Sequence, residues 1–390
     1  MLEISSAGFI YSHKIMKQQK TLFTLLFILT IASIFLFSGC SSGTDDQPTP
    51  TTDGFDRKIM LENLADNIII PSYNNLNDKI LDLKISADNF SQNINSDNLI
   101  DLRSKWLRAY KAWQHVEMFN IGKSEEIYYA FKMNSYPADA ARIEANIESN
   151  SYDLVNQANN HDAQGFPALD YMLYGLSGDS LSVLDKYLSI EGNKYITYLD
   201  TLVESMTNNT NLVIEYWNNN RNTFVSSYDN TATSSFNMLT NDFIYYYEKG
   251  LRANKIGIPA GRYSSGPLSD KVEAYYRKNI SKELALEALS ACNKFFIGQS
   301  FSSLETGESL KTYLDYTNEN STLSDEIVST LANAKDKIEM LNNNFVEQIS
   351  TNNVAMLEAY DAVQVGVVKL KTDMLFALNI SVDYIDADGD

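Results

Sequence analysis

Cysteine and histidine are scarce in this 390-residue chain, which limits the chemistry that it can carry. Its two cysteines, Cys40 and Cys292, are too few for a disulfide framework. Zinc sites rely on cysteine and histidine, and the three histidines, His13, His115 and His161, offer little for one. The chain also has no Walker loop, no dinucleotide-binding fingerprint, no G-x-S-x-G elbow and no H-E-x-x-H motif. Hydrolytic chemistry is therefore hard to build from these residues.

The N-terminal residues have the pattern of a targeting segment. A basic region with three lysines precedes an almost wholly apolar run over residues 22–37, which is short for a membrane span. The run ends in FSGC, which resembles the bacterial lipobox, although Phe37 stands where leucine is usual. We therefore expect residues 1–39 to be a lipoprotein signal peptide and Cys40 to be the lipidated residue. An uncleaved anchor helix is the alternative.

The stretch after Cys40 is polar and rich in proline, glycine and threonine, which predicts a flexible tether over residues 40–54. The expected location is the bacterial cell envelope, with the lipid anchored in the outer membrane on its periplasmic or surface side. The other cysteine, Cys292, lies in the apolar stretch LSACNKFF and is expected in the core.

Positive charge is the second shortage. The chain has 31 Lys and Arg residues against 50 Asp and Glu residues, a formal net charge of −19. Removal of residues 1–39 would take away three basic residues and one acidic residue, which leaves a net charge of −21. Such a surface repels polyanions, so a nucleic-acid-binding role is excluded.

Proline is also rare, and this favours helices. All seven prolines lie outside or at the edges of periodic segments, and strand-like alternation is scarce. The clearest predicted helix covers residues 99–119. At about 100° per residue, one narrow stripe collects Leu99, Leu102, Trp106, Tyr110 and Trp113.

The remaining amphipathic segments complete an all-α prediction. They lie near residues 57–70, 76–90, 182–218, 234–256, 268–297, 308–316, 323–350 and 353–380. Asparagine-rich stretches at 218–222 and 317–320 are interpreted as connections. We predict two packed four-helix-bundle-like domains, residues 55–222 and 223–390, with the break near 217–230.

Two groups on the predicted 99–119 helix could carry chemistry. Glu117 follows Trp113 by four residues and falls near the centre of the apolar stripe, whereas His115 falls on the opposite, solvated side. An inward carboxylate needs a partner or a shifted pKa. The alternatives are that Glu117 pairs with a buried Arg, Lys or Tyr, or that the helix ends before it.

A second candidate is the stretch GFPALDYMLYG, residues 165–175. Pro167 suits the first turn of a helix, where its missing N–H costs nothing, and Gly165 permits a tight turn before it. In helical projection Asp170 shares a face with apolar residues and points toward the core. The alternative is that Asp170 is only a charge favoured at the start of a helix.

The third candidate is the stretch from residue 245 to residue 267. Glu248 and Arg252 are spaced i,i+4, and the simplest reading is a surface ion pair. The loop GIPAGRYSSG that follows could approach a ligand, which would make Arg252 a binding residue. The alternative is a structured connection between helices.

Together these stretches resemble the imelysin-like lipoprotein family, which is also classed as a peptidase family and includes iron-regulated envelope proteins. WLRAYKAWQHVEMFNIG is similar to the family's early segment. GFPALDYMLYG is similar to its signature, usually G-x-H-x-x-E followed by a tyrosine and an apolar run that ends in glycine. SKELALEALSACNKFFIG with GESLKTYLDY resembles the second half. The resemblance covers most of the chain after the tether.

The resemblance implies two packed helical bundles with a pocket near the signature. Gly165 matches the signature glycine, Pro167 stands at the histidine position and Asp170 stands at the glutamate position. Trp113 and Glu117 match the early segment. If family members bind a metal through that histidine and glutamate, this chain lacks half of the pair, because a proline ring has no ligand atom.

These residues favour a non-catalytic envelope lipoprotein that binds a small ligand or a metal, with iron uptake implied by the resemblance. Oxygen ligands suit hard cations such as Ca²⁺ or ferric iron. One alternative is a structural or interaction module with a vestigial pocket. The reading with least support is a metallopeptidase, because three zinc ligands cannot be assembled. The candidate ligand-binding residues are Asp170, Glu117, Pro167, Gly165, Trp113 and Arg252, of which the first two are the candidate metal ligands.

Overall fold

Helices make up nearly all of the regular structure in residues 53–176, 180–317 and 322–383, which the computed structural model describes (side chains of 180–182 excepted). The predicted signal peptide, Cys40, most of the tether and residues 318–320 lie outside these residues. Within them there is no β-strand, only an isolated bridge between Gln299 and Thr306. The predicted all-α fold class is confirmed.

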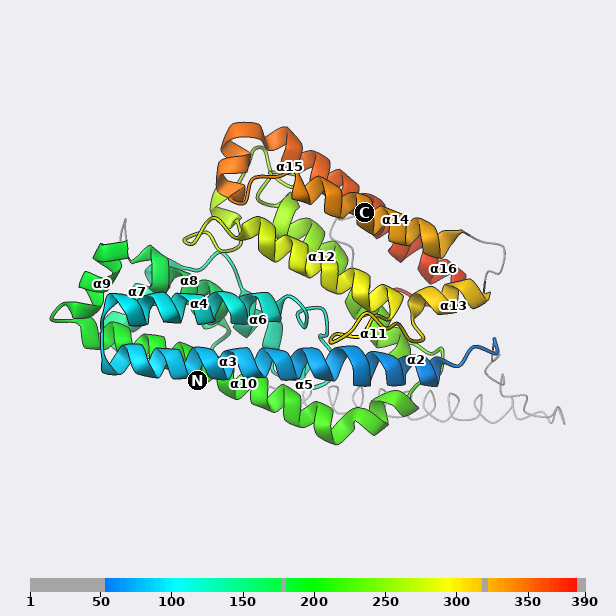
Figure 1. The fold of residues 1–390 in the computed structure, drawn as a ribbon, viewed down its shortest axis with the longest axis horizontal. Coiled ribbons are helices and arrows are strands. Elements are labelled where there is room, and N and C mark those ends of the chain that lie inside the picture. Colours follow the sequence, from blue (N-terminus) through cyan, green and yellow to red (C-terminus); the bar gives the residue numbers. More distant parts are fainter. Residues whose placement is uncertain (1–52, 177–179, 318–321, 384–390) are drawn as a thin grey trace, which may run out of the picture. The chain divides into compact units, whose positions relative to one another are not determined.

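Three long helices dominate the first half of the described chain. Helix α3 (Ile70–Gln92) packs against α4 (Ser96–Trp113) on one side and α10 (Gly192–Ser226) on the other (Figure 1). Helix α2 (Arg57–Asn63) leads into α3 through the π-helical turn η2 (Leu64–Ile69). Shorter elements connect α4 to α10, and they are α5 (Lys123–Glu126), α6 (Tyr129–Asn134), α7 (Ala140–Ser149), η3 (Ala158–Ala163), α8 (Gly165–Asp170), η4 (Tyr171–Gly175) and α9 (Ser180–Leu188).

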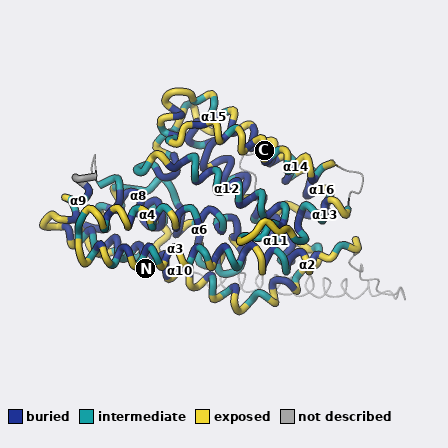
Figure 2. Tube along the Cα trace, viewed as in Figure 1, coloured by how far each residue is buried: buried dark blue, intermediate teal, exposed yellow. Residues whose placement is uncertain are grey.

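The second half forms a neighbouring group of helices. Helix α11 (Ser235–Tyr245) runs into the π-helical segment η5 (Tyr246–Gly257), which packs on α15 (Phe345–Val367) and α12 (Ser281–Ile297). The other elements are η6 (Ser269–Lys271), α13 (Leu310–Thr317), α14 (Leu323–Glu339), η7 (Val368–Met374) and α16 (Leu375–Ala377). Buried residues dominate the faces that the long helices turn to one another (Figure 2). Cys292 of α12 lies among them as a free thiol, as predicted.

The stretch at 218–222 is not a connection, and that prediction is wrong. Helix α10 continues through it to Ser226. Trp217 and Phe224 are both buried, and their rings meet edge to face with centroids 5.0 Å apart. The asparagines between them occupy the exposed face of the same helix, so apolar packing outweighs the weak helix propensity of asparagine. The division into two domains, residues 55–222 and 223–390, stays a prediction.

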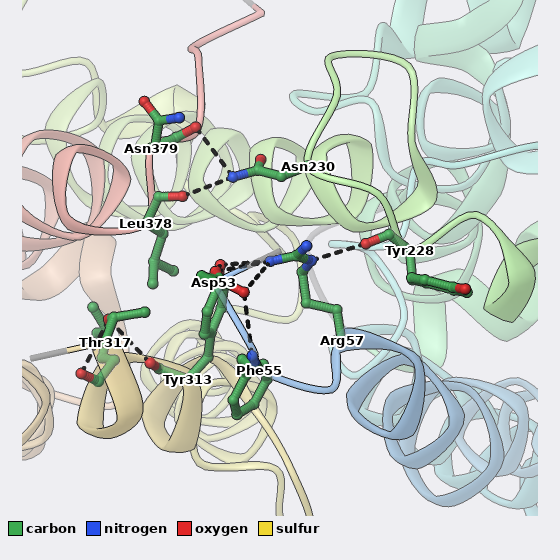
Figure 3. Close-up of polar contacts among 10 residues, drawn as sticks. Asp53, Phe55, Arg57, Tyr228, Asn230, Tyr313, Thr317, Leu378 and Asn379 are labelled. Carbon is green, nitrogen blue, oxygen red and sulfur yellow. Dashed lines mark hydrogen bonds and ion pairs between the residues drawn. The ribbon is translucent and has the colours of Figure 1, made fainter. Parts of the chain in front are cut away.

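The start of the described chain is fastened to its second half (Figure 3). The buried guanidinium of Arg57 donates from Nε to the Tyr228 carbonyl oxygen at 2.9 Å and from Nη1 to the Tyr313 hydroxyl at 2.8 Å. It also pairs with the Asp53 carboxylate at 2.9 Å, and Phe55 stacks on the Tyr313 ring. These contacts tie the segment before α2 to α13 and to the end of α10.

None of the helices in the described part of the chain is both long enough and apolar enough to cross a membrane.

Candidate functional site

A cavity of about 570 Å³ lies beside the GFPALDYMLYG stretch. One wall comes from the first half of the chain and includes Pro167 and Asp170 of α8. The opposite wall comes from the segment between η5 and α12. The described lining residues are Ser135, Tyr136, Pro137, Ala138, Asp139, Ala140, Asp162, Pro167, Asp170, Asp270, Lys271, Val272, Ala274, Tyr275 and Tyr276.

Asp170 joins the two walls. Its side chain is buried, with only 1% of the residue exposed. The carboxylate accepts the backbone N–H of Tyr276 at 2.8 Å and that of Arg277 at 2.9 Å. Burial raises the pKa of Asp170 to about 7, even though these two N–H groups and the charge of Arg277 act to lower it.

The helix-start interpretation of Asp170 is wrong. Asp170 is the sixth and last residue of α8, so it is not part of the first turn. Its hydrogen bonds go to a segment about a hundred residues further along the chain. The inward direction of the side chain does follow the helical projection. Asp170 therefore forms tertiary hydrogen bonds that join two distant parts of the chain, and it does not act as a charge at the start of its own helix.

Acidic side chains outnumber basic ones around the cavity, because four aspartates line it and the cations beside them are Lys271 and Arg142. The Arg142 guanidinium forms ion pairs with two aspartates. It lies 3.1 Å from the Asp162 carboxylate and 3.7 Å from the Asp139 carboxylate. Lys271 lies 3.4 Å from the Asp270 carboxylate. Part of the acidic charge is neutralised by this pairing, and the lining stays polar with an excess of aspartates.

Tyrosine rings supply much of the remaining lining. Burial raises the pKa of the Tyr136 hydroxyl well above its usual range, and the carboxylates of Glu273 and Glu117 raise it further. Burial also raises the pKa of Tyr276. Both hydroxyls therefore stay protonated at neutral pH and can donate hydrogen bonds.

A buried ion pair lies behind the second wall. Lys255 of η5 and Glu273, each 2% exposed, are joined by Nζ–oxygen distances of 2.7 and 2.8 Å. Glu273 also accepts hydrogen bonds from the side-chain amides of Asn134 at 3.0 Å and Gln114 at 3.2 Å. The residues on either side of Glu273, Val272 and Ala274, line the cavity, so the pair holds that wall in place.

Glu117 belongs to this ion pair and not to the cavity lining. Its carboxylate accepts from Asn134 at 2.8 Å and from the Tyr246 hydroxyl at 3.0 Å, and lies 3.6 Å from Lys255 Nζ. Both alternatives stated for Glu117 hold, because it is paired and helix α4 ends at Trp113 before it. Asp170 therefore binds the segment 273–277 directly, whereas Glu117 is linked to it only through Asn134 and Lys255, which also bind Glu273. The two acids do not line one cavity together.

Comparison with known proteins decides what kind of fold surrounds this cavity. The family model for imelysin, peptidase M75, matches residues 69–369, most of the chain. The chain belongs to the imelysin family. No curated protein matches it.

Two solved structures share the imelysin fold with this chain. An imelysin-like protein from Psychrobacter arcticum is 20% identical, with a TM-score of 0.67. A protein from Parabacteroides distasonis, named as an iron-regulated protein A precursor, is 17% identical, with a TM-score of 0.60. Each alignment covers 84% of this chain and 97% of the other. At these identities the likeness shows the fold.

The signature stretch begins at a position whose backbone conformation only glycine adopts without strain. Gly165 is the first residue of α8 and has φ +71°, in the left-handed region. A Cβ at this position would lie 2.2 Å from the Met133 carbonyl oxygen. Pro167 follows in the first turn, as predicted, and lines the cavity. Gly165 itself does not, so its role is to let α8 start against α6.

We expect Gly165→Ala to lower the free energy of unfolding by about 2–4 kcal/mol, because it adds positive-φ strain and a backbone clash. The measurement is urea unfolding followed by circular dichroism. Gly266→Ala is the matched control, since nothing lies within 4 Å of its added Cβ, and it should stay within about 0.5 kcal/mol of the parent. Equal effects of the two substitutions would contradict this account.

The cavity lining also leaves out Trp113, Arg252, Glu248 and His115. Trp113 is a core residue whose ring meets Tyr129 edge to face at 5.2 Å. Arg252 and Glu248 do pair, at 3.4 Å, but in the interior, so the surface interpretation is wrong. His115 is not fully solvated either, because α4 ends at Trp113 and only 14% of the His115 side chain is exposed. Its Nε2 lies 3.1 Å from Glu287.

Metal binding by Asp170 and Glu117 stays a prediction. Across the residues that the structure describes, no three His, Cys, Asp or Glu side chains come close enough to hold a metal ion. A metal at this cavity would therefore need further oxygen donors from a small ligand or from water.

The sequence did not predict the conformation of the second wall or the side chains that hold it in place. Residues 268–280 were predicted as the start of a helix, but α12 begins only at Ser281. Ala274 and Lys278 have φ of +57° and +65°, which a helix does not allow. The sequence offers no local signal for Glu273 or Lys255, because other charged residues such as Lys271 and Arg252 lie close to each of them.

Proposed function

We propose that this imelysin-family protein is a non-catalytic lipoprotein that binds a small polar ligand in the cavity beside Asp170. The observation that carries the proposal is the cavity itself, at the family signature and within the volume range of about 300–1,000 Å³ typical of ligand sites. Its tyrosines and aspartates offer hydrogen-bond donors and acceptors on both walls.

The chemistry of the lining supports binding rather than peptide cleavage. Catalytic zinc takes three protein ligands, usually with histidine among them. The described residues that line the cavity include neither histidine nor cysteine, and Pro167 occupies the position of the signature histidine. We therefore propose that the peptidase label of the family does not extend to this chain.

An association with iron is part of the proposal. It is supported by the name of the Parabacteroides distasonis protein, which shares this fold. Since no three protein ligands converge here, we propose that any ferric iron would enter as a complex with a small oxygen-rich ligand. The proposed location is the outer membrane of the bacterial cell envelope, through lipid on Cys40, and the proposed partners are the membrane and the small ligand.

A structural or interaction module is the second candidate. It is favoured by the two backbone hydrogen bonds of Asp170, which use its carboxylate to fasten one wall to the other. In that case the cavity would have no occupant and the residues would serve packing alone.

Calorimetry separates the two candidates. Ferric citrate, citrate, Ca²⁺ and Zn²⁺ are titrated into the purified protein and into Ala138→Phe, which fills the cavity from its wall. We expect binding of ferric citrate or citrate to weaken about tenfold or more in Ala138→Phe, because the ring takes the ligand's volume. Ala332→Phe, on the exposed face of α14, is the control and should bind like the parent. No binding to the parent protein would favour the structural module.

A further inference from the structure

Two aromatic side chains are exposed at the start of α6, outside the signature stretch. Tyr128 is 62% exposed and Phe131 is 55% exposed. The His161 ring lies against both of them. It is stacked on the Phe131 ring with centroids 5.9 Å apart and tilted against the Tyr128 ring at 6.4 Å. The three rings therefore form one aromatic surface, and none of them lines the cavity beside Asp170.

Tyr128 adopts a backbone conformation that a tyrosine disfavours. Its φ of +55° and ψ of +43° lie in the left-handed region, which glycine and asparagine adopt more readily. Because most of the ring is exposed, packing of the side chain does little to offset this strain. Residues held in strained conformations are concentrated at functional sites.

A lysine on the same face of α6 has no carboxylate partner. Lys132 is only 7% exposed, and its Nζ makes no hydrogen bond or ion pair with any residue that the structure describes. Its backbone N–H donates to the Tyr128 carbonyl oxygen at 3.0 Å, so the two residues lie one helical turn apart on one face. Burial lowers the pKa of His161 and the charge of Lys132 lowers it further, which places the ammonium near that ring. We name the surface made by Tyr128, Phe131, Lys132 and His161 the α6 patch.

The charge of Lys132 is poorly compensated within the protein. Burial lowers its pKa, and Asp153 is the carboxylate that acts against burial. The Asp153 oxygens already accept N–H groups from residues 155 and 156 of their own loop. Lys255 shows the opposite case, since its carboxylate partners outweigh burial and raise its pKa. An anionic group at the Lys132 ammonium would supply the missing counter-charge.

We infer that the α6 patch binds a planar aromatic carboxylate. The ring of this ligand would stack against Tyr128 and Phe131 and remove their exposed faces from water. Its carboxylate would accept hydrogen bonds from the Lys132 ammonium. A saturated acid would satisfy only the lysine, and a neutral aromatic molecule would satisfy only the rings.

The test is calorimetric titration of the full-length protein with 2-naphthoate, 2-naphthamide and decalin-2-carboxylate. The amide keeps the aromatic rings and lacks the charge, whereas the decalin acid keeps the charge and lacks flat rings. We expect 2-naphthoate to bind at least about fivefold more tightly than either of the other two.

Variants assign the two parts of this preference. Lys132→Met, which keeps the volume of the stem and removes an unpaired ammonium, should fold at least as stably as the parent. It should weaken 2-naphthoate at least about fivefold and leave 2-naphthamide unchanged. Lys335→Met, at an exposed lysine that pairs with Glu339, is the control for net charge and should bind like the parent. Tyr128→Asn, which tolerates the left-handed backbone, should weaken 2-naphthoate and 2-naphthamide alike.

Four results would each overturn the inference. They are no binding of 2-naphthoate, equal binding of 2-naphthoate and 2-naphthamide, equal losses in Lys132→Met and Lys335→Met, and loss of binding in Ala138→Phe. The last result would place the ligand in the cavity beside Asp170 and not on the α6 patch.

Discussion

Replacement of Lys255 by methionine is expected to lower the free energy of unfolding by about 3–5 kcal/mol at neutral pH, as for other buried ion pairs that lose one partner. The substitution leaves Glu273, 2% exposed, with no cation at its oxygens. Methionine fills most of the volume of the lysine stem, so the loss reports the uncompensated charge and not a cavity. Urea unfolding followed by circular dichroism measures the difference.

A double variant separates the charge from other effects. In Lys255→Met/Glu273→Met both partners of the pair are gone, and buried ion pairs replaced by apolar residues are often neutral in stability. More than half of the lost stability should therefore return. If the double variant is as unstable as Lys255→Met alone, the damage comes from packing or from Glu117 and not from the unpaired Glu273.

The pH dependence adds a second check on Lys255. Burial alone would lower its pKa, but the carboxylates of Glu273 and Glu117 more than offset this, and the pKa is raised. The stability that a raised lysine pKa contributes is fully present below the unfolded value, about 10.4. It is lost only as the pH rises through the folded pKa. Titration of Lys255 itself should therefore contribute nothing to a difference between the effects of Lys255→Met at pH 6 and at pH 9.

The long helices, the all-α fold and one wall of the cavity could be predicted from the sequence. Periodic apolar residues predict the long helices and the all-α fold, because each helix buries one face. The inward direction of Asp170 follows from the same projection. The family signature then marks the correct wall of the cavity, since Pro167 and Asp170 both line it.

The second wall could not be predicted because its conformation depends on distant partners. Residues 273–277 depart from a helix where Glu273 reaches Lys255 and where Asp170 accepts two backbone N–H groups. Nothing within the segment itself encodes these contacts. The wrong prediction for the direction of the His115 side chain has a similar cause, because it assumed a helix over residues 99–119 and α4 ends at Trp113. Local periodicity predicts helices, and long-range polar contacts decide where they end.

Replacement of Asp170 by asparagine is expected to change the pH dependence of stability. Burial raises the pKa of Asp170 to about 7, whereas an unfolded aspartate has a pKa of about 3.9. Between these values the folded state keeps a proton that the unfolded state releases, so stability falls as the pH rises. Asparagine does not titrate. The stability advantage of the parent over Asp170→Asn should therefore shrink by about 2–3 kcal/mol between pH 5 and pH 8.

The difference in free energy of unfolding between the parent and Asp170→Asn, compared at two pH values, isolates the titration of Asp170. Other acids such as Asp242, whose pKa burial raises to about 8, are present in both proteins, and their contributions cancel in this difference. A constant difference would mean that Asp170 does not titrate in this range. A difference that grows with pH would mean that the N–H groups of Tyr276 and Arg277 outweigh burial and hold the carboxylate charged. If ligand binding in Asp170→Asn also matches the parent at pH 5, Asp170 positions the wall of the cavity and does not contact the ligand.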